Sequence, residues 1–202
     1  MKKFLKAVYK KLTKLLLGTE IRRFKLIKKI DNIITSYIKS DFVIIQGHKM
    51  FLDSKDSLRL SFSEYFEPFE TELVKNEIKN GYRVLDIGAN IGYYTLIIAD
   101  LIGENGLIYA FEPEPNNFKL LEKNIQINNL KNVVLYNKAA SNFNGYIDFY
   151  INKTTEGGHS IYKSANSEDR PIQVETIKLD NCITDKIDFV KIDVEGAEGE
   201  VL

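Results

Sequence analysis

The run from Asp86 to Gly92, D-I-G-A-N-I-G, constrains the fold of this chain more than any other segment. An apolar stretch at 84–87, long enough for one buried strand, precedes it, and an apolar stretch of helical length follows at 93–102. Between them stand glycine and asparagine, residue types that tolerate positive φ and let a ligand approach the backbone. A strand, a glycine turn and a helix begin a nucleotide-binding βαβ unit, which binds its ligand at the carboxyl end of the strand. We therefore expect an α/β fold with a ligand site at this turn.

Two acidic residues at predicted strand ends favour one class of ligand. Asp86 ends the first strand, and Glu112 ends a second apolar run that begins at Leu107. The turn glycines, Gly88 and Gly92, lack the G-x-G-x-x-G spacing that places a pyrophosphate on helix amides. A carboxylate at this turn repels phosphate but suits an ammonium and a sulfonium, and an acid ending the second strand can bond a ribose diol. The pattern predicts S-adenosylmethionine and disfavours a NAD-dependent dehydrogenase. The alternative is that both acids only cap turns.

Together with the 86–92 run, three further motifs resemble the FkbM family of S-adenosylmethionine-dependent methyltransferases. These motifs are F-E-P-F-E-T at 66–71, F-E-P at 111–113 and K-I-D-V-E-G-A-E at 191–198. The resemblance implies a doubly wound, Rossmann-like methyltransferase fold. It also implies O-methylation of a sugar or natural-product hydroxyl, by in-line displacement in which alignment of the reactants is the enzyme's chief contribution.

The resemblance covers most of the chain from about residue 41 and divides it into two parts. We expect a basic amphipathic helical extension at 1–40 and a methyltransferase domain at 41–202. Family members continue past the fourth strand, so this domain is expected to lack its last strands and to be weakly stable. The alternative to an enzyme is a truncated, non-catalytic remnant that binds a cofactor, a partner or a membrane. A test of whether the purified chain binds S-adenosylmethionine distinguishes the enzyme from the non-catalytic remnant.

The residues expected to hold the cofactor lie on the glycine turn, at strand ends and on the upstream motif. They are Glu70, Asp86, Gly88, Asn90, Gly92, Glu112, Pro113, Asn137 and Ala139. By resemblance Glu70 lies near the cofactor's amino group, although an acid in a first helical turn can simply favour the helix dipole. After the third predicted strand, the small side chain of Ala139 leaves room for an adenine ring, and Asn137 can bond near it.

The candidate catalytic residues are Asp193, Glu195 and His159. Asp193 and Glu195 follow the fourth predicted strand and, by resemblance, face the reacting centre, where they can orient an acceptor hydroxyl or receive its proton. Two carboxylates without a nearby histidine are weak grounds for a metal, and we expect none; Glu195 can instead begin the last helix. His159 stands in a polar, glycine-rich loop at 152–160 that can cover the acceptor site. The alternative is that His159 is an ordinary surface histidine.

The first 39 residues are strongly basic, with 12 Lys and Arg against 2 Asp and Glu, a net charge of +10. Apolar residues at helical spacing with lysines opposite predict an amphipathic helix near residues 1–18. The lysines interrupt any signal-peptide or membrane-spanning core. Two uses remain open: peripheral contact with an anionic membrane surface, and packing on the domain or a partner chain. Nucleic acid is not expected, because the rest of the chain is acidic and lacks a binding module.

Cys182 is the only cysteine, so this sequence cannot form an intrachain disulfide. A lone cysteine fits a reducing compartment. We therefore expect a cytoplasmic protein, with the basic helix as a peripheral contact at the inner face of the membrane.

Overall fold

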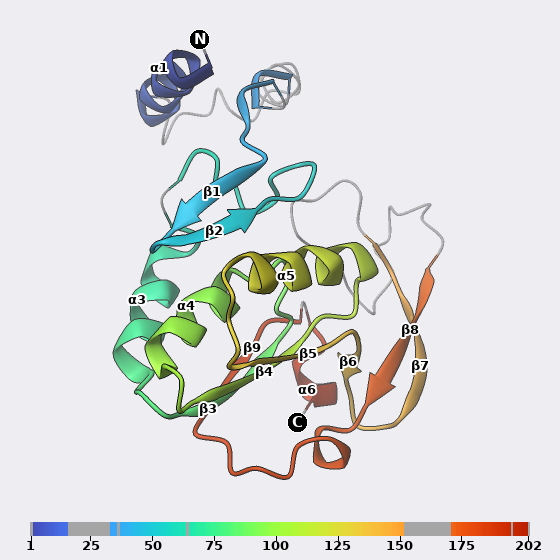
Figure 1. The fold of residues 1–202 in the computed structure, drawn as a ribbon. Coiled ribbons are helices and arrows are strands. Elements are labelled where there is room, and N and C mark those ends of the chain that lie inside the picture. The colour runs from blue at the N-terminus through green and yellow to red at the C-terminus, as the bar shows by residue number, and fades with distance from the viewer. Residues whose placement is uncertain are drawn as a thin grey trace.

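A computed structural model describes residues 2–15, 33–35, 37–63, 65–151, 171–194 and 196–201. Its centre is a four-stranded parallel sheet with the order β5-β4-β3-β9 (Figure 1). The strands are β3 (Arg83–Ile87), β4 (Leu107–Phe111), β5 (Val133–Tyr136) and β9 (Phe189–Ile192). These strands confirm the four parallel strands and the α/β class predicted from the sequence. The order reverses beside β3, which has β4 on one side and β9 on the other, and ligands bind at such a reversal in open α/β sheets.

Helices and a hairpin cover one face of this sheet. The helices are α3 (Pro68–Glu77), α4 (Tyr93–Ile102) and α5 (Pro115–Ile127). Val84, Ile108 and Ala110 pack against them in the larger of two hydrophobic clusters. The opposite sheet face presents residues that include Leu85 and Phe111 to α6 (Glu198–Val201) and to residues around a short 3₁₀ turn, η2 (Leu179–Asn181). Both faces are therefore covered, as a doubly wound fold requires.

Two short apolar runs around the Gln46-Gly47 turn predict a hairpin, and it is present as β1 (Phe42–Ile45) and β2 (His48–Phe51). Asn124 of α5 and Asn128, which caps the C-terminal end of α5, bind its second strand. Asn124 accepts a hydrogen bond from the Phe51 backbone N–H and donates to the carbonyls of Phe51 and Ile91. Asn128 makes the matching pair of bonds with the backbone of Lys49. Because a side-chain amide carries a donor and an acceptor, the two asparagines bond the edge of β2 much as a neighbouring strand does.

A second, smaller sheet stands beside the carboxyl end of the parallel sheet. Its order is β6-β8-β7, with β6 (Ala139–Ala140) parallel and β7 (Gly145–Phe149) antiparallel to β8 (Ile172–Ile177). Alternating apolar and polar residues predict strands at 146–151 and 172–179, and β7 and β8 confirm both. The loop at 152–160, with His159, lies outside the described residues.

The N-terminal helix α1 (Lys2–Leu15) lies at the end of the molecule opposite α6 (Figure 1). A second helical stretch, at 33–35 and 37–38, leads from it toward β1. Ile38 in this stretch is buried, and the Ser40 N–H donates to Ser61 Oγ at 2.8 Å. Among the helices in the described ranges, none is long and apolar enough to cross a membrane.

Candidate active site

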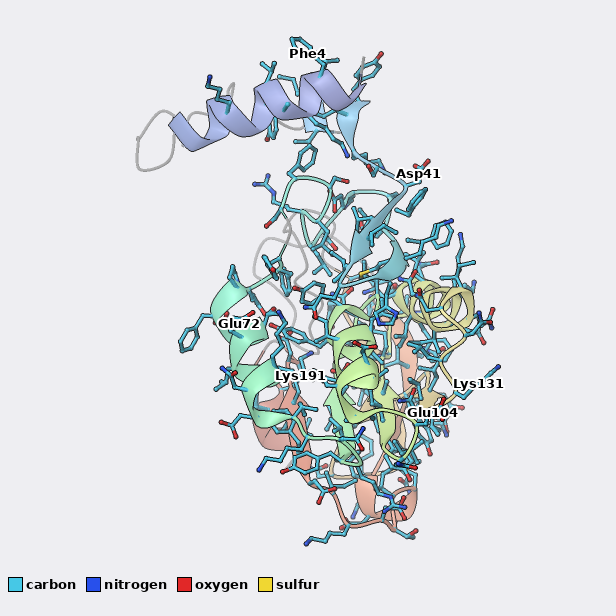
Figure 2. The ribbon with its side chains drawn as sticks, turned by 60° about the vertical axis from the view of Figure 1, so that its left-hand side comes forward. Phe4, Asp41, Glu72, Glu104, Lys131 and Lys191 are labelled. Carbon is cyan, nitrogen blue, oxygen red and sulfur yellow. The ribbon has the colours of Figure 1, made fainter. Side chains whose placement is uncertain are left out.

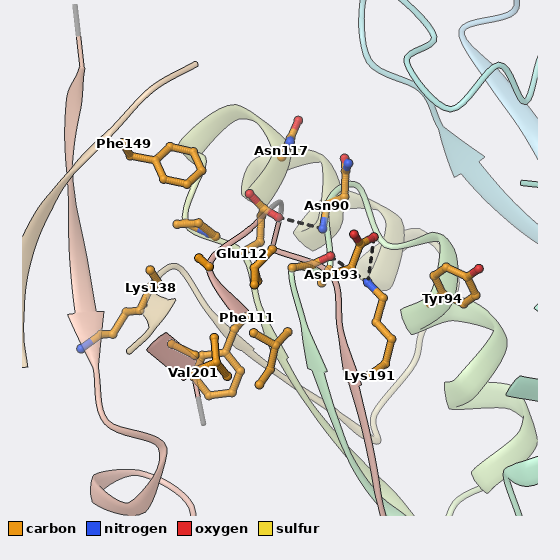
Figure 3. A pocket seen from close by; sticks show the side chains of 18 of the residues that line it. Asn90, Tyr94, Phe111, Glu112, Asn117, Lys138, Phe149, Lys191, Asp193 and Val201 are labelled. Atoms are coloured by element: carbon orange, nitrogen blue, oxygen red, sulfur yellow. Dashed lines mark hydrogen bonds and ion pairs between the residues drawn. The ribbon is translucent and has the colours of Figure 1, made fainter. Parts of the chain in front are cut away.

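A cavity of about 460 Å³ opens where β3, β4 and β9 end (Figure 3). One part of its wall is polar and includes Glu67, Asn90, Glu112, Lys191 and Asp193. Another part is apolar and includes Phe111, Phe143, Phe149 and Ala139. The cavity therefore offers charged groups along the strand ends and apolar side chains, two of them phenylalanines, beside the small sheet, which suits a ligand with an aromatic ring and a charged tail.

Glu112 is held rigidly in this wall. Its carboxylate accepts hydrogen bonds from the backbone N–H groups of Asn90 and Glu114, both at 2.8 Å. Burial raises the pKa of Glu112 to about 7, although those two bonds lower it. Each carboxylate oxygen retains a second lone pair for a ligand hydroxyl. The side chain is thus placed to accept bonds from a vicinal diol.

The glycine turn brings the ends of two strands into contact. Gly88 has φ of +79°, and a Cβ added to it would lie 2.0 Å from the backbone oxygen of Asp193. Any side chain at position 88 would have to displace the end of β9. The glycine therefore allows both strand ends to border the same cavity.

Lys191 joins the charged groups behind the glycine turn. Its ammonium donates to the Gly88 carbonyl at 3.0 Å and lies 3.3 Å from Asp86 Oδ1 and 3.6 Å from Asp193 Oδ2. The Asp86 carboxylate is fully buried and accepts a bond from Thr95 Oγ1 at 2.6 Å through its other oxygen. Among the described residues, Asp86 Oδ1 accepts no hydrogen bond. Its polar partner there is the Lys191 ammonium, with which it forms an ion pair.

The F-E-P motif at 66–68 reaches the cavity through Glu67. The backbone at Glu67 is left-handed, with φ of +43°, immediately before α3. Tyr94 donates its hydroxyl to Glu67 Oε2 at 3.0 Å, and burial raises the pKa of Tyr94 well above its ordinary value, so the phenol remains a donor. Tyr93 accepts a bond from the Phe66 N–H. Two tyrosines that begin α4 therefore hold this loop at the cavity edge.

These groups fit S-adenosylmethionine. Four carboxylates in the cavity wall, from Glu67, Glu112, Asp193 and Glu200, outnumber the ammonium groups of Lys138 and Lys191. An excess of negative charge suits a ligand with a sulfonium and an ammonium, and Glu112 suits its ribose. Among the described residues, no three histidine, cysteine or acidic side chains gather closely enough to hold a metal ion.

The family model of the methyltransferase FkbM domain matches residues 86–202, more than half of the chain. The chain belongs to the FkbM methyltransferase family. S-adenosylmethionine is accordingly its cofactor and, when bound, supplies the activated methyl group.

Known proteins similar to this FkbM methyltransferase domain are also methyltransferases. Methyltransferase 1 of Beauveria bassiana is 26% identical, and the match covers 76% of each chain. A protein-L-isoaspartate O-methyltransferase of Fervidobacterium nodosum is 36% identical over 29% of this chain and 30% of its own. Among solved structures, M. jannaschii TYW2 in complex with AdoMet is 26% identical, with a TM-score of 0.37, and the match covers 48% of this chain and 43% of that one. The chain thus spans about three quarters of the Beauveria bassiana relative and less than half of the other two.

The FkbM domain brings six of the predicted site residues into the cavity wall. They are Gly88, Asn90, Glu112, Pro113, Ala139 and Asp193. Four others lie outside that wall: Glu70, Asp86, Gly92 and Asn137. Asn137 instead donates to the backbone carbonyls of Glu112 and Pro113. Glu195 and His159 lie outside the described residues, so their catalytic roles stay predictions.

Sequence reasoning did not single out three residues of this wall, Glu67, Tyr94 and Lys191. The upstream F-E-P-F-E-T motif contains two glutamates, and the first, not the second, faces the cavity. Lys191 is the one charged residue within an otherwise apolar strand, and a lysine there requires a buried acid nearby. That requirement was a usable signal, because Asp86 is an acid at the end of another predicted strand.

Proposed function

We propose that this FkbM domain transfers a methyl group to a hydroxyl oxygen of a small-molecule or glycan acceptor. The acidic wall beside Lys191 carries the proposal, because Glu67 and Asp193 are carboxylates that accept hydrogen bonds from a hydroxyl. The same wall repels an acceptor carboxylate, which the isoaspartate methyltransferases methylate according to their name. A neutral hydroxyl is the acceptor that this electrostatic environment favours.

Asp193 is the residue we assign to the acceptor hydroxyl. Its side chain is half-exposed at the end of β9, 3.6 Å from the Lys191 ammonium. With the cofactor bound, the carboxylate would orient the hydroxyl toward the activated methyl group and would receive its proton as the oxygen–carbon bond forms and the sulfur–carbon bond of the sulfonium breaks. Orientation of the reactants is expected to supply most of the rate enhancement. The loss of proton transfer alone is therefore expected to lower kcat by about 10²–10⁴-fold.

The experiment is transfer of labelled methyl from S-adenosylmethionine to a panel of acceptors by the full chain. Half of the panel carries free hydroxyls, as glycosides and polyols, and half carries free carboxylates, as peptides. We expect label in an ether product, and Asp193→Asn should lower kcat while the affinity for S-adenosylhomocysteine stays within about twofold. Label in base-labile methyl esters would overturn the proposal.

We also place this reaction in the cytoplasm. The proposal rests on the single cysteine, Cys182, which cannot form an intrachain disulfide in this sequence. Expression of the chain in a reducing and in an oxidising compartment tests it, and the reducing compartment should give the greater yield of chain that binds S-adenosylhomocysteine. The reverse result would contradict this location.

A further inference from the structure

Helix α1 contacts the domain along one edge. Lys6 Nζ donates to Ser40 Oγ at 2.6 Å, and the ring of Tyr9 lies 5.1 Å from that of Phe62. Lys6 and Tyr9 are three residues apart, so they mark one line along the helix. This line is the border between the apolar and the lysine-bearing faces of α1.

The apolar face of α1 is directed elsewhere. At about 100° per residue, Phe4 and Val8 lie about 40° apart, whereas Tyr9 is about 140° and Lys6 about 200° around the helix from Phe4. Phe4 is 72% exposed, and Leu5 and Val8 are also exposed. Figure 2 shows Phe4 on the side of α1 that faces away from the domain. The domain contact therefore leaves the described part of this apolar face open.

Exposed apolar residues recur on the helical stretch next to α1. Ile33 is 61% exposed, and Ile34 and Tyr37 are exposed as well, while Ile38 is buried against the domain. Both segments lie at the same end of the molecule (Figure 1). We call the six exposed side chains of the two segments the N-terminal apolar surface: Phe4, Leu5, Val8, Ile33, Ile34 and Tyr37. Clustered apolar exposure of this kind marks an interaction site.

Charge identifies the partner. Residues 2–15 contain six lysines and no acidic residue. We propose that the N-terminal apolar surface and the lysines of α1 other than Lys6, which bonds to Ser40, bind the surface of an anionic lipid bilayer. The apolar side chains enter the boundary between headgroups and acyl chains, and the lysines pair with lipid phosphates. A nucleic acid would use the lysines but would leave the exposed aliphatic side chains in water, so the bilayer accounts for both features.

Vesicle binding by the full chain tests this inference. We expect co-sedimentation with vesicles of phosphatidylglycerol and phosphatidylcholine, little with phosphatidylcholine alone, and release in high salt, since salt screens the attraction. Phe4→Ser with Val8→Ser should weaken partition about tenfold or more, because it removes apolar contact without changing charge.

The chain offers a matched control. Phe69 and Leu73 on α3 are also an exposed aromatic and an exposed aliphatic residue four positions apart, and Phe69 is 77% exposed. Phe69→Ser with Leu73→Ser should leave vesicle binding unchanged. Equal losses in the two double variants, no binding to anionic vesicles, or binding of a labelled RNA in place of vesicles would each overturn the inference. Circular dichroism of each variant confirms that it is folded.

Discussion

At the residue scale, we expect the raised pKa of the buried Glu112 carboxyl to make cofactor binding depend on pH. A ribose diol donates to the ionised carboxylate, so a ligand bound there favours loss of the proton. Because the pKa of Glu112 is about 7, the affinity for S-adenosylhomocysteine should rise as pH increases through neutrality, by up to about tenfold per pH unit on the acid side. Calorimetry from about pH 6 to about pH 8 measures this.

Glu112→Gln is the control for that titration. Its amide cannot accept from both backbone N–H groups, so binding should be weaker at every pH and the pH dependence should disappear. A wild-type affinity that does not change over this range would contradict the assignment of Glu112 to the ribose.

The ion pair of Lys191 with Asp86 gives a second prediction. Lys191→Met leaves the fully buried Asp86 carboxylate without its charge partner, and we expect a loss of about 3–5 kcal/mol in the free energy of unfolding. Adding Asp86→Asn removes the unpaired charge while the bond from Thr95 can remain, so the double variant should be more stable than Lys191→Met alone. Urea denaturation of all four proteins in this cycle measures the coupling. Additive losses would show that the pair does not contribute as a unit.

Much of the site was predictable residue by residue, because parallel strands place the residues after their carboxyl ends together. Gly88, Glu112 and Asp193 all follow from that rule and line the cavity. Asp86 follows it as well, but its side chain lies outside the cavity wall, where Thr95 of α4 and Lys191 of β9 bind it. The position of a residue at the end of a strand predicts the edge of the sheet on which it lies. The direction of its side chain depends on the partner residues that the fold brings near it.

At the element scale, Asn124 of α5 and Asn128 at the C-cap of that helix bond to the edge of β2 in place of a neighbouring strand. Asn124→Ala would leave a backbone N–H and two carbonyls without their partner in a buried setting, and each unsatisfied group costs about 1–3 kcal/mol. Asn128→Ala removes a similar number of bonds where the side chain is only half-buried, so water can replace them. We expect the larger loss of unfolding free energy from Asn124→Ala, measured by denaturation of the two variants side by side. Equal losses would contradict the role of burial.

The helices and strands themselves were largely predictable because apolar runs are separated by glycine, proline and asparagine. β3, α4 and β4 all lie where the pattern placed them, and β5 coincides with the apolar run at 133–136. The neighbours of β9 were not predictable in the same way, since its partner β3 is distant in sequence and no local signal specifies the pair. The left-handed backbone of Glu67 was also missed, because glutamate has no preference for that conformation.

At the scale of the whole molecule, we expect α1 and the stretch at 33–35 and 37–38 to contribute differently to stability. The described contacts of α1 with the domain are partly exposed, whereas Ile38 is 2% exposed. Removal of residues 1–15 should therefore change the free energy of unfolding by about 1 kcal/mol or less. Ile38→Ala in the full chain should cost about 2–5 kcal/mol, because it leaves a cavity. Urea denaturation compares the two, and a greater loss from the deletion would contradict this division.

The pairing of β3 with β9 also affects when the protein becomes able to bind its cofactor during synthesis. Val84 pairs with Phe189, so roughly 100 residues must be translated after β3 before its second neighbour exists, which takes roughly 5–20 s at about 5–20 residues per second. During that interval one edge of β3 has no strand beside it, and Gly88 has no Asp193 carbonyl against it. The cofactor cavity is then complete only after β9 docks, so a nascent chain that has already folded α4 and α5 cannot yet hold its ligand.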